Sequence, residues 1–225
     1  MSKILPGCRL RLKTIPQLGL GLAILLLSIS ALTGEEKPAG KSPLDRFSSE
    51  EQKNLLAGKP IYRFQKSADA EGKYSGYGQC WAIINSPIDT CFKIFLEFEK
   101  QYQYYPRKTK SEVVNRKPNQ VWLLNVFDFY LAEISYTVLY TIDPNRYRIE
   151  FQLDQNYPHN LNDTSGFFWF EKMDDQKTLF TYAAVKVDTG LKVPSFIQQY
   201  LTSRDLPAVA ENVKKRIESG GKWTK

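Results

Sequence analysis

The chain has 225 residues, of which 42% are hydrophobic and 13% aromatic, and this length fits one domain with extensions. The hydrophobic content supports a sizeable core and excludes a disordered chain. The formal net charge is +7, but four of the basic side chains lie in residues 1–17, so the charge does not indicate a nucleic-acid-binding protein, which needs a clustered basic face.

The N-terminal segment has the three-part order of a secretory signal peptide. Residues 1–17 carry basic side chains and no acidic one, and they precede the uncharged apolar run Leu18–Leu32. Small residues end this run before Glu35. The run is shorter than the roughly 20 residues that span a bilayer. We therefore expect residues 1–34 to be a signal peptide and the protein to be periplasmic or secreted, with an uncleaved membrane anchor as the alternative. Removing residues 1–34 would lower the net charge from +7 to +3.

Residues 35–60 are expected to form a linker and a short N-terminal helix. Residues 35–47 are rich in Lys, Pro, Gly and Ser, which is typical of a linker. Ser48 and Glu51 have the spacing of a capping box. This spacing predicts a helix from about Glu50 to Ala57.

Residues 61–225 are expected to form the main domain. Residues 61–75 are polar and predict irregular structure. Seven later runs are rich in β-branched and aromatic residues and predict strands. In chain order, these runs are Gln79–Asn85, Ser111–Asn115, Val121–Phe127, Ala132–Ile142, Tyr147–Leu153, Gly166–Phe170 and Thr178–Val187. Short loops separate the last six, which favours antiparallel neighbours.

Two helical regions interrupt and follow these strands. After Pro87 the apolar residues repeat every three or four positions, which predicts two short helices between the first two strands. From Pro194 onward a long amphipathic helix is expected, with a kink at which Asp205 and Pro207 begin a second segment. An antiparallel sheet needs a cover for its apolar face. The pattern therefore predicts an α+β helix-grip fold, in which a seven-stranded antiparallel sheet wraps around the C-terminal helix.

Several motifs support this fold. The first is a strand–proline–helix corner at residues 82–89, followed by Tyr104-Tyr105-Pro106. Next come an aromatic strand that begins with residues 162–166 and, after it, Val193–Phe196. In this order, over about residues 50–219, they resemble a bacterial exported branch of the SRPBCC, or START-like, superfamily. That superfamily includes polyketide cyclases, lipid-transfer domains and coenzyme Q-binding proteins. The resemblance implies an apolar cavity between the sheet and the C-terminal helix.

The ligand-binding candidates are bulky apolar and aromatic residues of the predicted interior. They are Trp122, Tyr136, Tyr140, Phe151, Phe168, Phe170, Phe180 and Tyr182, with Leu124 beside them, facing Phe196, Tyr200, Val209 and Val213. Such side chains can form the apolar wall of a pocket, with phenols to orient a polar head. They can equally fill the core, and both interpretations remain open.

Polar residues that could carry chemistry are few. His159 is the single histidine, and with Asp154 and Asp163 it could form an acid–base site, although its surroundings are typical of a surface loop. We expect Cys80 and Cys91 to be small buried side chains; a disulfide would need Cα atoms within about 7 Å. No spacing of metal ligands is present, and no cofactor is expected.

Three hypotheses of function follow. The first is an exported, non-enzymatic carrier of a hydrophobic small molecule of the lipid, isoprenoid or quinone class. The second is an enzyme like the polyketide cyclases or dehydratases, which would use cavity tyrosines with Asp154, Asp163 or His159. The third is a protein-interaction module that uses its loops or the Ser48–Ala57 helix. The expected partners are a hydrophobic small molecule or lipid and, transiently, a membrane; we expect no nucleic acid partner and a monomer.

Overall fold

The computed structural model describes residues 42–68, 74–128, 133–188 and 195–225, and of residues 65–68, 74–77 and 195–206 it describes the backbone alone. The predicted signal peptide lies outside the described residues. The helices are α1 (Ser49–Leu56), α2 (Ile88–Phe95), the 3₁₀ helix η1 (Phe98–Gln103) and α3 (Ser195–Glu218). The strands are β1 (Ile61–Ala68), β2 (Tyr74–Ile84), β3 (Lys108–Lys117), β4 (Gln120–Asp128), β5 (Glu133–Asp143), β6 (Arg148–Leu153), β7 (Asp163–Lys172) and β8 (Thr178–Asp188).

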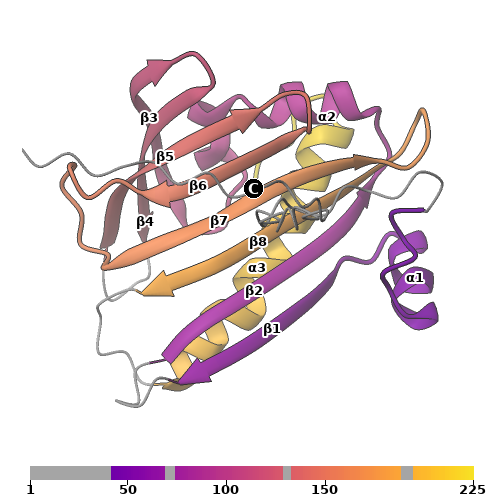
Figure 1. Ribbon diagram of the computed structural model, residues 1–225, viewed down its shortest axis with the longest axis horizontal. Coiled ribbons are helices and arrows are strands. Elements are labelled where there is room, and N and C mark those ends of the chain that lie inside the picture. The colour runs from indigo at the N-terminus through magenta and orange to yellow at the C-terminus, as the bar shows by residue number, and fades with distance from the viewer. Residues whose placement is uncertain (1–41, 69–73, 129–132, 189–194) are drawn as a thin grey trace, which may run out of the picture. The chain divides into compact units, whose positions relative to one another are not determined.

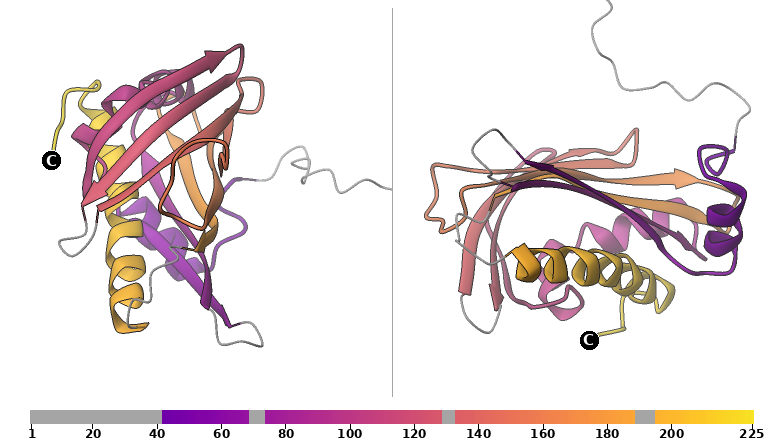
Figure 2. Two further views of the ribbon diagram at one scale, coloured as in Figure 1. Left: turned by 90° about the vertical axis from the view of Figure 1, so that its left-hand side faces the viewer. Right: turned by 90° about the horizontal axis from the view of Figure 1, so that it is seen from below.

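The eight strands form one sheet in the order β1-β2-β8-β7-β6-β5-β4-β3, and every neighbouring pair is antiparallel. The sheet curves, and α2 and α3 lie against its concave face (Figures 1 and 2). The α+β helix-grip arrangement is therefore confirmed, including the two short helices that follow the proline corner.

The sheet has one strand more than the sequence predicted. Residues 61–68, which we expected to be irregular, form the edge strand β1, and β2 begins at Tyr74 rather than Gln79. An edge strand pairs with a single neighbour, so it can carry polar residues that interrupt an apolar pattern. On β1 the ring of Tyr62 is 51% exposed.

The long helix is continuous, so the predicted division into two segments at Asp205 is wrong. Pro207 lies inside α3. A proline in a helix interior removes one hydrogen bond and strains the preceding turn. Beyond Pro207 the helix buries Ala210, Val213 and Ile217 in the core, and this packing stabilises it.

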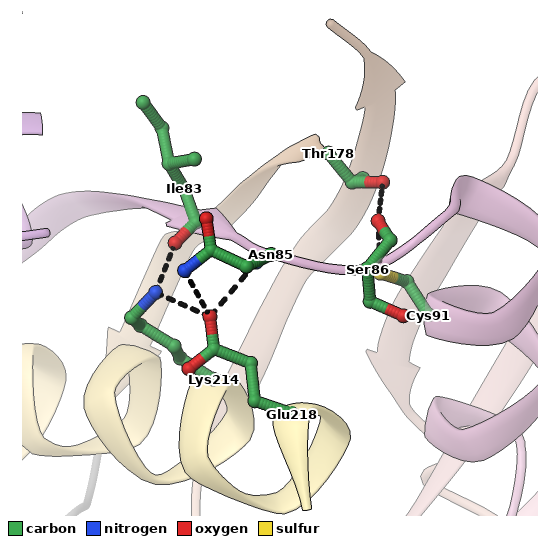
Figure 3. A network of polar contacts seen from close by, with 7 residues as sticks. All are labelled: Ile83, Asn85, Ser86, Cys91, Thr178, Lys214 and Glu218. Atoms are coloured by element: carbon green, nitrogen blue, oxygen red, sulfur yellow. Dashed lines mark hydrogen bonds and ion pairs between the residues drawn. The ribbon is translucent and has the colours of Figure 1, made fainter. Parts of the chain in front are cut away.

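Polar contacts fix the C-terminal half of α3 to the end of β2 (Figure 3). Lys214 Nζ donates to the carbonyl oxygen of Ile83 at 2.6 Å and pairs with Glu218 Oε1 at 2.6 Å. The same Glu218 oxygen accepts hydrogen bonds from the backbone and side-chain nitrogens of Asn85, each at 2.8 Å. These contacts satisfy the backbone where β2 leaves the sheet.

The proline corner contains one of the two described cysteines. Thr178 Oγ1 donates to the Ser86 carbonyl oxygen at 2.9 Å, and the Cys91 thiol lies 3.5 Å from the same oxygen (Figure 3). Cys80 and Cys91 are both buried and unbridged, as expected. Burial raises the pKa of the Cys80 thiol to about 12, so it stays protonated at neutral pH.

The convex face carries a smaller cluster beneath α1. Along β2, Trp81 and Ile83 point away from the concave face, because side chains of a strand alternate. They pack with Phe47 and Leu55 from the N-terminal segment and with Leu179. Helix α1 is therefore part of the same folded unit as the sheet.

The capping box predicted for α1 is present. Ser48 Oγ accepts from the Glu51 N–H at 3.3 Å, and the Glu51 carboxylate accepts from the Ser48 N–H at 2.9 Å. Replacing Ser48 with Ala should lower the free energy of unfolding by about 1 kcal/mol, measured by urea denaturation. Ser48→Asp, which keeps the cap, should cost less than Ser48→Ala; an equal loss in both variants would contradict this role.

Candidate functional site

The concave face and its covering helices enclose a core rich in aromatic rings. Phe168 stacks on Tyr182 with centroids 4.8 Å apart, and Phe98 of η1 stacks on Tyr140 at 4.5 Å. Of the predicted candidates, those completely packed into this core are Tyr140, Phe151, Phe168, Phe170, Phe180, Val209 and Val213. In the structure these side chains fill the core and leave little surface for a ligand.

Two predicted tyrosines differ from the rest because they retain accessible surface. Tyr136 on β5 and Tyr182 on β8 are only partly buried and pack against the core. Even so, desolvation by the surrounding protein raises the pKa of both phenols. Both rings therefore lie at the edge of the aromatic core, where part of their surface stays accessible. Tyr136 and Tyr182 are therefore the predicted residues best placed to meet a ligand.

Trp122 lies on the opposite face from the one expected. Its neighbours Val121 and Leu123 belong to the core, and alternation along β4 directs Trp122 and Leu124 to the convex side. There Trp122 Nε1 donates to Asp154 Oδ2 at 2.7 Å. The run Val121–Leu124 is apolar throughout, so its pattern could not show which residues face inward.

Phe196 and Tyr200 fall on the part of α3 whose side chains lie outside the described residues. Their predicted place in the cavity wall stays a prediction.

A polar cluster lies inside the core, at the junction of η1, β3 and β4. Lys108, the first residue of β3, is only 2% exposed. Its Nζ donates to Gln101 Oε1 at 2.8 Å and to Asn125 Oδ1 at 2.7 Å. The ammonium group also lies over the Tyr105 ring, 4.5 Å from its centroid. No carboxylate of the described residues forms an ion pair with Lys108, and burial lowers its pKa well below the usual range, with a smaller effect from Lys225.

Two groups of this cluster have unused hydrogen-bonding capacity. Tyr105 Oη is buried and makes no hydrogen bond within the described part of the chain, and Gln101 Nε2 has no close partner there, although the Gln101 side chain interacts with the Tyr140 phenol. Desolvation raises the pKa of Tyr105 well above its usual range, and the nearby phenols of Tyr140 and Tyr182 raise it further. The tyrosine hydroxyls are thus close enough to influence one another. Buried donors without acceptors are rare, and they often mark the place of a ligand or of ordered water.

Sequence reasoning missed this cluster. Lys108 looks no different from Lys110, which is exposed and pairs with Glu112 on the outside of β3. The one usable signal was Asn125, a polar residue within an otherwise apolar strand. A polar residue there needs a buried partner, but the sequence could not identify Lys108 as that partner.

The structure does not bring the three predicted acid–base residues into the core. His159 is exposed, and its Nδ1 lies 2.8 Å from the Tyr157 carbonyl oxygen. Asp163 pairs with Lys186. Asp154 caps the turn at Asn156 and binds Trp122 on the convex side; hydrogen bonds from the Asn156 backbone and from Trp122 lower its pKa, although desolvation opposes them. The enzyme hypothesis therefore loses its main support.

A surface recess of about 300 Å³ lies where the start of β1 approaches α3. Its lining includes Lys59, Glu211, Lys214 and Lys215. Charged side chains around an open recess do not fit an apolar ligand. Among the described residues, no helix is long and apolar enough to cross a membrane, and no three potential metal-ligand side chains converge.

Comparisons with known proteins show the fold. No protein-family model and no curated protein sequence matches the chain. A START superfamily protein from Mycobacterium smegmatis matches with a TM-score of 0.54 and 18% identity, over 64% of this chain and 97% of that one. Human StAR-related lipid transfer protein 5 matches with a TM-score of 0.54 and 10% identity, over 72% of this chain and 83% of that one. The Zhui aromatase/cyclase from Streptomyces sp. R1128 matches with a TM-score of 0.50 and 15% identity, over 72% and 99%.

The architecture is therefore START-like, as the sequence motifs suggested. At 10–18% identity, these likenesses establish the fold alone. This fold hosts unrelated functions, so the function has to be argued from the interior of this chain.

Proposed function

We propose that the protein is an exported carrier of a hydrophobic small molecule of the lipid, isoprenoid or quinone class. The carrying observation is the pair Tyr136 and Tyr182, two partly exposed phenols at the edge of an aromatic core. The START-like neighbours that are named as lipid transfer proteins support this class of ligand. The signal-peptide pattern of residues 1–34 supports export.

An aromatic core with accessible phenols at its edge can provide what a carrier needs. Aromatic walls remove a ligand's chain from water, which contributes about 0.8 kcal/mol for each buried methylene. The phenols next to the apolar surface can orient a polar head. Within this proposal the carrier acts as a monomer and contacts a membrane only while it loads or releases its ligand.

The purified protein should carry such a ligand. We expect mass spectrometry of an organic extract to find one or a few apolar compounds in near-stoichiometric amount. Adding the recovered compound at about 100 times its Kd should stabilise the protein by about 2.7 kcal/mol, seen as a higher melting temperature. An empty extract, together with no shift across a panel of lipids and quinones, would exclude a carrier of this class.

A pair of variants locates the binding site. Tyr136→Trp enlarges a ring at the proposed binding surface and should weaken binding about tenfold or more. Tyr62→Trp, on the exposed side of β1, is the matched control and should leave the affinity unchanged. Equal affinity in both variants would place the ligand elsewhere on the molecule.

A further inference from the structure

Among the described residues, no carboxylate pairs with Lys108 Nζ, which is buried in the polar cluster. An ammonium group buried without a counter-ion costs several kcal/mol, because the interior does not solvate it as water does. The contact with the Tyr105 ring and the two amide oxygens offset only part of this cost. Burial accordingly lowers the pKa of Lys108, and an anion bound beside its Nζ would favour the charged form.

The unused hydrogen-bonding groups of the cluster are mainly donors. Among the described residues, two amide oxygens account for two of the three N–H groups of Lys108. The Tyr105 hydroxyl makes no hydrogen bond there, and Gln101 Nε2 has no close partner, although the Gln101 side chain interacts with the Tyr140 phenol. A set of donors with one positive charge selects a head group that accepts hydrogen bonds and carries one negative charge.

The cluster adjoins Tyr136. Asn125 on β4 stands directly opposite Tyr136 on β5, so their side chains are neighbours on the concave face. Tyr105 is electrostatically coupled to Tyr182, the other ring with accessible surface. A ligand whose chain lies along Tyr136 and Tyr182 would therefore direct its head toward Lys108.

We infer that the ligand of this interior is a long-chain carboxylic acid, whose carboxylate is bound by Lys108, Gln101 and Tyr105. This inference rests on the proposed carrier function and adds the chemistry of the head group. One lysine balances the single charge of a carboxylate. A phosphomonoester carries nearly two charges, and the second would remain uncompensated in a medium of low dielectric constant.

The test compares three probes that share one chain and differ in the head: hexadecanoic acid, hexadecanol and methyl hexadecanoate. Each is titrated into the purified full chain, freed of bound lipid, below the concentration at which the probe aggregates. The acid should bind at least about tenfold more tightly than the alcohol or the ester. Equal binding of all three would overturn the carboxylate inference and leave the carrier function standing. No binding by any probe would count against both.

Variants assign the preference to Lys108. In Lys108→Met the acid should lose its advantage over the alcohol, while the alcohol binds as it does to the wild type. Lys110→Met is the matched control on the same strand, where the lysine is exposed, and it should keep the advantage of the acid. A retained preference in a folded Lys108→Met protein would contradict the assignment.

A second variant keeps the test decisive if Lys108→Met does not fold. Asn125→Asp is isosteric and places a carboxylate beside Lys108, where Asn125 Oδ1 now lies at 2.7 Å. This internal counter-ion should compete with the ligand and weaken acid binding about tenfold or more, with alcohol binding unchanged. Undiminished acid binding would show that the head does not reach the cluster. If the acid preference is absent from the wild type, the cluster holds water only.

Discussion

Replacing Gly166 with Ala should destabilise the protein by more than about 4 kcal/mol or prevent folding. Gly166 lies on β7 next to Ser165, at a register shift in the pairing of β7 with β8. A Cβ added there would stand 2.0 Å from the Ala183 carbonyl oxygen and 2.6 Å from Cζ of Phe151. The carbonyl oxygen belongs to the paired backbone of β8, so it cannot move aside as a flexible side chain could.

The measurement is urea denaturation followed by far-UV circular dichroism, or the soluble yield if the variant does not fold. Gly220→Ala is the control, because a Cβ there meets no atom within 4 Å and only the positive φ of 66° is strained. It should cost about 1 kcal/mol. Phe151→Ala combined with Gly166→Ala should not restore stability, since the carbonyl remains. If Gly166→Ala unfolds at the same urea concentration as the wild type, β7 and β8 do not approach so closely at this position.

Raising the pH above about 10 should unfold the protein cooperatively. Desolvation raises the pKa of five phenols, those of Tyr104, Tyr105, Tyr136, Tyr140 and Tyr182. In the unfolded chain a phenol loses its proton near pH 10, so above that pH the folded state binds more protons than the unfolded state. Stability is therefore complete below about pH 10 and falls as the pH rises, by up to about 1.4 kcal/mol per pH unit for each phenol.

Other buried groups, among them Cys80 and Lys108, change the profile at lower pH. The Cys80 thiol, with its pKa raised to about 12, contributes a loss that begins near the ordinary pKa of cysteine. Lys108 has the opposite sign. Burial lowers the pKa of Lys108 in the folded state, so the unfolded chain binds more protons at this group. The contribution of Lys108 to stability therefore rises with pH until about pH 10.4. Near pH 9 these opposing effects partly cancel, and the steep loss from the phenols follows.

The measurement is the free energy of unfolding in urea from about pH 7 to about pH 11. Tyr105→Phe removes one phenol and should reduce the alkaline slope by about 1.4 kcal/mol per pH unit. At neutral pH the same variant should be neutral or stabilising, because the Tyr105 hydroxyl is buried without a hydrogen bond. Tyr62→Phe is the control on an exposed ring. An unchanged slope in Tyr105→Phe would show that water reaches this phenol in the folded state.

Local patterns predicted most of the fold. Seven strands, the capped helix α1 and the corner at Pro87 were predictable because strand alternation, capping spacing and proline geometry depend on residues close together in the chain. The edge strand β1 was missed, since its pairing with β2 depends on distant backbone groups rather than on its own composition. The two helical segments expected on either side of Asp205 and Pro207 form one helix, because burial of Val213 and Ile217 outweighs the local cost of a proline.

The sequence by itself determined that this is an α+β protein with an aromatic interior, a covering C-terminal helix and an N-terminal export pattern. Only the tertiary structure decided which aromatic rings fill the core and which two keep accessible surface. The tertiary structure places Trp122 on the convex face. The sequence could not show this, because an apolar run does not indicate which residues face the interior. The tertiary structure also brought Lys108 to Gln101 and Asn125, a meeting of three segments that no local pattern encodes. Composition and periodicity record how each segment prefers to fold, whereas a binding site depends on which segments meet.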